Sequence, residues 1–225
     1  MSKLLWVILT RRLLLAMAVI LVTGVAYYLI SGHSLSKASP PSTADVLDAI
    51  NGQTSFCWEA EVKAFSNGSL KERAGVKGCI NYENGSAIWV RDIDGRKRVI
   101  HASRNDSDDP YWRMALEGWG AEWNVMNFLR KVLKEGKLES VRETGEGYEM
   151  ELTFNWGESY SAGTIENGTR VTASHVLKLS LLVDGDGRPL GGNFTEDVER
   201  NYLDWNRVEG ERTEGSFELL GPWES

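Results

Sequence analysis

An uninterrupted apolar run near the N-terminus constrains this chain more than any other feature of its sequence. The run covers residues 13–30 and contains no charged side chain. In a helix it would measure about 27 Å, close to the roughly 30 Å hydrocarbon core of a bilayer. Lys3, Arg11 and Arg12 precede it, and the first charge after it is Lys37. The positive-inside rule therefore predicts a cytoplasmic segment 1–12, a transmembrane signal anchor 13–30 and an extracytoplasmic remainder.

Two other interpretations of the run stay open. A cleaved secretory signal has a shorter apolar core, usually about 7–15 residues. The pair Arg11-Arg12 also resembles a twin-arginine export motif, although the segment is very apolar for that route. All three interpretations place the rest of the chain outside the cytoplasm. Our expectation is a single-pass protein of the cell membrane with its C-terminal domain extracytoplasmic.

A tether and one domain are expected after the anchor. Residues 31–43 are rich in Ser, include Pro40-Pro41 and lack apolar periodicity, which indicates a tether. Residues 44–225 are long enough for a single domain with its own core. This exported part carries 22 Lys and Arg against 32 Asp and Glu, a net charge of −10, because three of the 25 basic residues precede the run. Such a charge argues against nucleic acid as a partner.

The first half of the domain predicts a short helix followed by a four-stranded meander. Ser42-x-x-Asp45 has the form of a capping box that opens a helix over 43–50. Asn-Gly and Asp-Gly turns then separate strand-like segments, and these dipeptides are strong hairpin signals. The expected strands are 56–65, 70–82, 87–93 and 96–102.

The two cysteines test the register of the first hairpin. If the turn is centred on Gly68, Cys57 lies directly opposite Cys79. The same register opposes Glu59–Lys77, Phe56–Ile80, Ala60–Val76, Val62–Ala74 and Trp58–Gly78. Directly opposed cysteines outside the cytoplasm favour a disulfide, with two buried thiols as the alternative. A bulge at Gly68 would shift this register by one residue.

Helices interrupt the strands in the middle of the chain. Asp109-Pro110 predicts a helix start, with a short helix continuing to Glu117. An amphipathic helix is then expected over 121–135, closed by Gly136. Later strands are predicted at 138–143, 148–156, 163–166, 169–174, 176–184, 192–198 and 216–220, with a loop or helical turn at 202–205.

The layout resembles the lipoprotein-carrier superfamily, which includes the LolA-like and LppX/LprG-like proteins. Residues 45–62 resemble its opening helix and first strand. Residues 129–134 with 147–152 resemble its plug helix and following strand, and residues 176–190 resemble its strand, Asp turn and Pro-Leu hairpin. The resemblance covers roughly 45–218 and implies an α+β fold. That fold is a curved, incompletely closed antiparallel sheet, or half-barrel, with plugging helices. No lipobox cysteine follows the apolar run, so the membrane helix would replace the lipid anchor.

The resemblance also implies a function and a set of residues. We expect a membrane-tethered carrier for a lipid or other apolar ligand. The expected ligand-binding residues are Trp58, Trp89, Trp119, Trp123, Phe128 and Leu133. The alternative is a filled core, in which these rings pack on each other. The domain would then be a non-enzymatic structural or interaction domain with an envelope protein as partner.

No pattern of catalytic or metal-binding residues accompanies these features. The three histidines, His33, His101 and His175, are scattered, and no nucleophile, phosphate or dinucleotide motif occurs. We therefore expect no enzyme activity, no cofactor and no metal. Asn-x-Ser/Thr sequons occur at Asn67, Asn84, Asn105, Asn167 and Asn193 and are candidate glycosylation sites.

Overall fold

The computed structural model describes residues 39–105, 109–118, 120–163 and 168–222. Those from Pro40 onward belong to one compact unit. The predicted anchor 13–30 and most of the tether lie outside the described residues, as do Trp119 and Asn167. Over the part of the chain described, no helix is both long and apolar enough to cross a bilayer.

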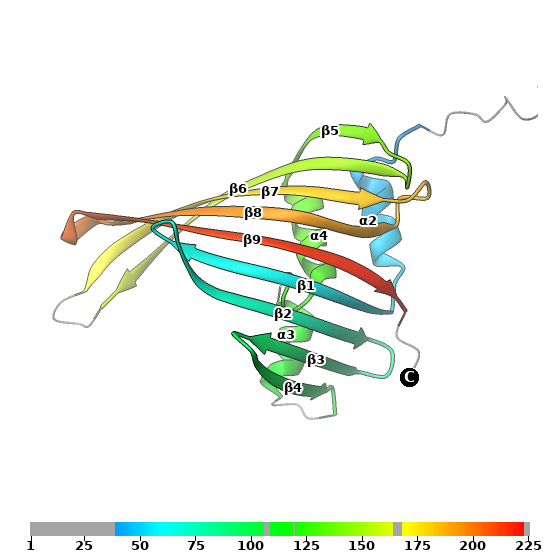
Figure 1. The fold of residues 1–225 in the computed structure, drawn as a ribbon, viewed down its shortest axis with the longest axis horizontal. Helices are drawn as coiled ribbons and strands as arrows, with labels where there is room; N and C mark the ends of the chain where they lie inside the picture. The colour runs from blue at the N-terminus through cyan, green and yellow to red at the C-terminus, as the bar shows by residue number, and fades with distance from the viewer. Residues whose placement is uncertain (1–38, 106–108, 119, 164–167, 223–225) are drawn as a thin grey trace, which may run out of the picture. The chain divides into compact units, whose positions relative to one another are not determined.

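A single nine-stranded antiparallel sheet forms the framework of this unit (Figure 1). Its spatial order is β4-β3-β2-β1-β9-β8-β7-β6-β5, so the first and last strands pair in its middle. The outermost strands, β4 and β5, do not pair with each other, and the sheet stays open. The strands are β1 Ser55–Ser66, β2 Ser69–Asn81, β3 Ser86–Ile93, β4 Arg96–Ser103, β5 Lys137–Glu143, β6 Tyr148–Ala162, β7 Thr169–Val183, β8 Pro189–Tyr202 and β9 Arg207–Gly221. The prediction of an open antiparallel sheet with helices is confirmed.

The first hairpin has the register that the sequence predicts. Cys57 lies opposite Cys79, and their sulfur atoms form a disulfide with the two Cα atoms 4.1 Å apart. The five other predicted pairs are present as well. The bulge lies between Ala64 and Phe65, close to the turn, so it leaves the pairs around the disulfide unshifted.

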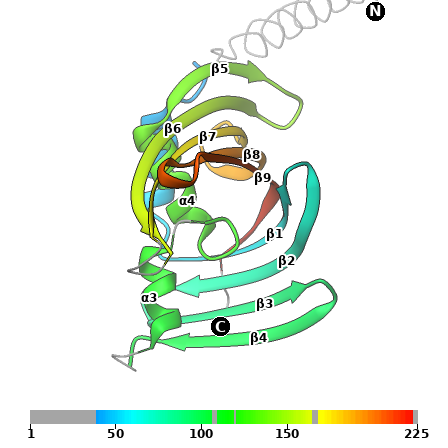
Figure 2. The same ribbon diagram turned by 90° about the vertical axis from the view of Figure 1, so that its left-hand side faces the viewer.

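Three helices lie together on one face of the sheet (Figure 2). They are α2 Thr43–Asn51, α3 Pro110–Glu117 and α4 Val125–Glu135. The predicted capping box is present in α2, and Pro110 occupies the first turn of α3. The prediction that the last helix starts at Ala121 is wrong. The chain turns before Asn124, whose side chain accepts a hydrogen bond from the Asn127 amide and caps α4.

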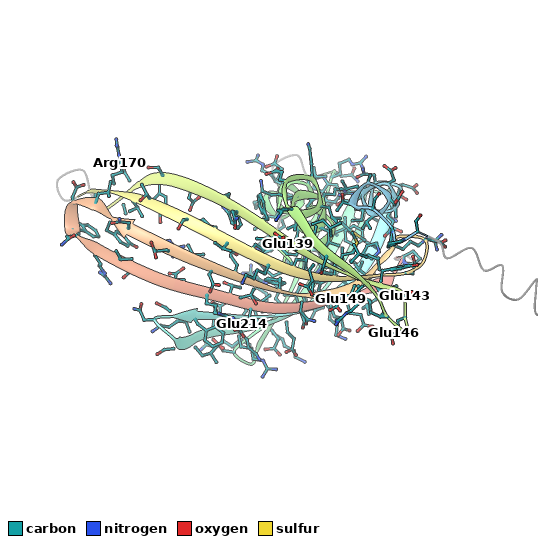
Figure 3. All side chains as sticks on the ribbon, turned by 90° about the horizontal axis from the view of Figure 1, so that it is seen from above. Glu139, Glu143, Glu146, Glu149, Arg170 and Glu214 are labelled. Carbon is teal, nitrogen blue, oxygen red and sulfur yellow. A yellow bond between two sulfur atoms is a disulfide. The ribbon has the colours of Figure 1, made fainter. Side chains whose placement is uncertain are left out.

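The four strands β6 to β9 are longer than the sequence predicts. Strand β7 is continuous through His175, where two separate strands were expected, because both of its neighbours pair with it there. Leu203–Trp205 forms a 3-10 turn between β8 and β9. The strands extend well beyond the helices, and Arg170 lies near their far end (Figure 3). None of the described helices covers this far part of the strands.

The core lies between the helices and the sheet face turned toward them. On β7, alternate residues from Thr169 to Val183 are buried, which is the period of a strand with one covered face. The helices contribute their apolar stripe, most strongly α4, where six of eleven residues are buried. We call this face of the sheet the inner face and the opposite one the outer face.

Candidate functional site

Five of the six predicted ligand-binding residues lie on or under the inner face. Trp58 and Trp89 are fully buried, with 0% of each exposed, and Phe128 and Leu133 are nearly so at 2% and 4%. Trp123 is only partly buried and packs against the same core. Trp119 lies outside the described residues. The structure therefore brings these residues together, and their role in binding a ligand stays a prediction.

The indole groups of two strand residues fix the turn that precedes α4. Trp58 on β1 donates its Nε1–H to the carbonyl of Ala121 at 2.9 Å, and Trp89 on β3 donates to the carbonyl of Trp123 at 2.9 Å. A buried indole needs such an acceptor, because an unpaired N–H in an apolar core is costly. The sheet thus determines where Trp123 lies.

Asn124 fixes the same turn from the side of the helices. Its side chain is fully buried, and it donates to the Ala115 carbonyl at 2.6 Å and to the Tyr82 hydroxyl at 2.8 Å. These bonds connect the end of α3, the residue that follows strand β2 and the start of α4. The turn from Gly120 to Asn124 is consequently held on two sides.

Aromatic rings extend across the inner face beneath and beside α4. We define the aromatic band as Phe56, Trp58, Trp89, Trp123, Phe128, Phe154, Trp156, Phe194 and Phe217. Phe128 on α4 contacts Phe194 and Phe217, with ring centroids 5.2 and 6.2 Å apart. Trp123 and Trp156 are the band's partly buried members. They form its margin, where the band meets polar side chains.

Charged groups lie at the Trp123 end of the band. The Arg91 guanidinium stacks on the Trp123 ring, with its Cζ 4.2 Å from the ring centroid. Burial raises the pKa of the Glu122 carboxyl, and the positive charge of Arg91 opposes this rise. Sequence reasoning missed Arg91. The available signal was its spacing in the sequence. Ala87, Trp89 and Arg91 are every second residue of β3, so their side chains lie on the same face of the strand.

A histidine with two carboxylates lies at the Trp156 end. His175 stacks on Trp156 at 4.4 Å, and Trp156 stacks on Phe154 at 4.9 Å. Nδ1 of His175 lies 2.8 Å from Glu196, and Nε2 lies 3.5 Å from Glu158. No group of three or more His, Cys, Asp or Glu side chains in the described ranges is arranged to hold a metal ion.

The outer face carries a separate feature, an open groove of about 1320 Å³ that we call the outer groove. Its lining includes Gly75, Ser180 and Ser216 and residues 144–146. Six acidic residues line it, against two lysines: Glu59, Glu61, Asp92, Glu146, Glu149 and Glu218, with Lys77 and Lys97. Figure 3 shows Glu146 and Glu149 close together beside the β5–β6 turn. Acidic side chains thus outnumber basic ones in the outer groove, unlike in the aromatic band.

The candidate glycosylation sites have different settings. Asn67, Asn84 and Asn105 are exposed residues of turns. Asn193 is exposed on β8 and lines the outer groove, so a glycan there would occupy part of that groove. That these residues carry glycans stays a prediction.

No protein-family model matches the chain, and no curated protein matches it. The solved structures that are similar to it include the following two. One is an S-type phycobiliprotein lyase, CPES, from Guillardia theta, with 7% identity, a TM-score of 0.31, and coverage of 86% of this chain and 99% of that one. The other is a LolA superfamily protein, NE2245, from Nitrosomonas europaea, with 10% identity, a TM-score of 0.23, and coverage of 82% and 95%. A LolA superfamily protein is thus among the similar structures. Because both TM-scores are below 0.5, we derive the function below from this chain's own residues.

Proposed function

We propose that this chain is a membrane-tethered, non-catalytic carrier domain that binds a lipid or another apolar ligand on the outer side of the cell membrane. The observation that supports the proposal is the aromatic band, whose margin residues Trp123 and Trp156 are only partly buried. An apolar chain that covers such rings gains about 25 cal/mol for each Å² removed from water. The membrane run 13–30 would hold the domain beside a supply of such molecules.

Hydrogen bonds and ring stacking hold the residues of the proposed binding surface in place. The indole bonds of Trp58 and Trp89 and the side-chain bonds of Asn124 hold the turn that carries Trp123. On the other side, Trp156 is stacked between Phe154 and His175. Side chains that are fixed in this way lose little conformational entropy when a ligand binds, which favours affinity.

Photoreactive cross-linking tests the proposal on the intact protein. The full-length chain in a nonionic detergent would be irradiated with a diazirine-labelled palmitic acid, and the modified peptides would be identified by mass spectrometry. We expect adducts on the peptides that contain Trp123, Trp156 and the start of α4. Labelling confined to residues 13–30, or spread evenly over the outer face, would contradict the proposal.

The outer groove supports a second candidate, an interaction domain for an envelope protein. Its acidic lining fits a basic, extended polypeptide segment. Replacing both Glu146 and Glu218 with Gln should then weaken the binding of a Lys-rich peptide to the full-length chain, as measured by fluorescence anisotropy. Unchanged binding, or no binding by either protein, would remove this candidate.

A further inference from the structure

Two arginines lie side by side on the inner face of the sheet. Arg91 on β3 and Arg98 on β4 are directly opposed in the antiparallel register, which places both side chains on one face. That face is the one on which Trp89 and Ile100, also opposed, are buried. Two like charges directly opposite each other are destabilising, so the pair calls for a compensating negative group.

Aromatic side chains hold both guanidinium groups in place. Arg91 lies over Trp123, and Arg98 donates a hydrogen bond from Nη2 to the Tyr111 hydroxyl at 2.9 Å. Among the ion pairs of the described residues, none joins either guanidinium to a carboxylate within 4.0 Å. Neutral rings orient the two positive charges, and among the described residues neither guanidinium has a carboxylate in ion-pair contact.

One donor of this pair is buried without a partner. The Nε of Arg91 is shielded from solvent and has no hydrogen-bond acceptor in the described residues. A buried, charged donor in this state costs free energy that an incoming acceptor would recover. Glu122 lies within electrostatic range of Arg91, and burial favours its neutral form, which repels an anion less than a carboxylate does.

We propose that Arg91 and Arg98 bind the oxyanion head group, a carboxylate or a phosphate, of the apolar ligand. This inference rests on the proposed carrier function and names the ligand class. Guanidinium groups suit such head groups because their planar N–H donors match two oxygen atoms at once. Since Arg91 stacks on Trp123, a head group bound there leaves the attached chain at the margin of the aromatic band.

Competition against the photoreactive palmitic acid tests the assignment in the wild-type chain. The competitors are palmitic acid, hexadecanol and hexadecyl phosphate, which share one apolar chain and differ in the head group. We expect one or both anionic competitors to block labelling at a concentration about tenfold or more below that of hexadecanol, because hydrogen bonds to charged groups contribute roughly 1.5–3 kcal/mol.

The outcomes separate the two proposals. Equal competition by the acid, the phosphate and the alcohol would contradict head-group binding by the arginine pair but would leave the carrier function standing. No site-specific labelling at all would overturn both. Displacement of the probe by inorganic phosphate in the same range as hexadecyl phosphate would also overturn the assignment, because the arginines would then bind a free anion.

Single variants locate the effect. The measured quantity is the ratio of the hexadecanol concentration to the palmitic acid concentration that blocks labelling. In Arg98→Gln and Arg91→Gln, this ratio should fall toward one. Arg98 is exposed, so its replacement leaves the core untouched. Lys71→Gln is the control, because it removes the same charge from an exposed position on β2. A ratio that stays unchanged in both arginine variants, at unchanged melting temperature, would contradict the inference.

Discussion

Gly78 carries no side chain, and the ring of Trp58 occupies the space that a side chain would need. A Cβ built on Gly78 would lie 2.4 Å from Cη2 of Trp58. The two residues are directly opposed in the first hairpin, so the indole covers the glycine. This close approach allows Trp58 to reach the Ala121 carbonyl and hold the turn before α4.

Gly78→Ala should therefore destabilise the domain. The added methyl group must displace a fully buried ring, and overpacking of this kind costs about 1–3 kcal/mol. Gly75→Ala on the same strand is the matched control, since a Cβ there would meet no atom within 4 Å. Chemical denaturation of the two variants measures the difference. Equal free energies of unfolding for both variants would contradict this account of Trp58.

Glu122 predicts a pH dependence of stability with a definite sign. Its carboxyl has an ordinary pKa of 4.5, which burial raises in the folded chain. The folded state then holds the proton more tightly than the unfolded state, so stability falls as the pH rises from about 4.5 through the raised pKa. The Gln side chain of Glu122→Gln cannot ionise, so this variant should lack this part of the dependence of stability on pH.

Thermal unfolding between pH 4 and pH 8 would show the effect of Glu122. We expect the melting temperature of Glu122→Gln to rise relative to that of the wild type as the pH increases above about 4.5, and the difference to level off above the raised pKa. Glu83→Gln removes an exposed carboxylate and serves as the control. Parallel pH profiles for the wild type and Glu122→Gln would show that the burial of this carboxyl has no energetic consequence.

At the scale of elements, the disulfide connects β1 and β2 at the end of the hairpin far from its turn. The bond joins residues 22 apart in the sequence. Closing a loop of this length stabilises a fold by roughly 3 kcal/mol in the chain-entropy model. Replacing Cys57 and Cys79 with Ser together should lower the free energy of unfolding by about that amount, measured with denaturant under non-reducing conditions.

The same bond has a direct chemical test. Alkylation of the native, unreduced protein followed by intact-mass measurement should add no label to either cysteine. Two labels without prior reduction would contradict the disulfide. The register would still be testable, because Glu59 and Lys77 form an ion pair across the same two strands.

At the scale of the whole molecule, the expected topology separates the charges of the chain. The basic residues before the apolar run would stay in the cytoplasm, and the acidic domain would lie outside. Protease added to intact cells should therefore release a fragment that begins in the tether, 31–43. Protection of residues 44–225 until the membrane is lysed would contradict this topology.

Much of the local structure was predictable because its causes are local. The capping box of Ser42 and Asp45 and the Asn-Gly turn at Gly68 each depend on a few adjacent residues. The register that opposes Cys57 to Cys79 follows from that turn by counting. The lengths of β6 to β9 were not predictable in this way. Polar residues interrupt the apolar alternation of these strands. Each strand continues past them because it pairs with its neighbouring strands.

The first hairpin, the N-caps of α2 and α3 and the apolar face of α4 could be predicted from the sequence alone. These features need no knowledge of distant contacts. Only the tertiary structure decided that β9 lies beside β1, that Trp58 and Trp89 hold the turn before α4, and that Arg91 and Arg98 share the inner face with no carboxylate bound among the described residues. Each of these depends on groups far apart in the sequence, and the burial that orients them exists only once the helices have packed on the inner face of the sheet.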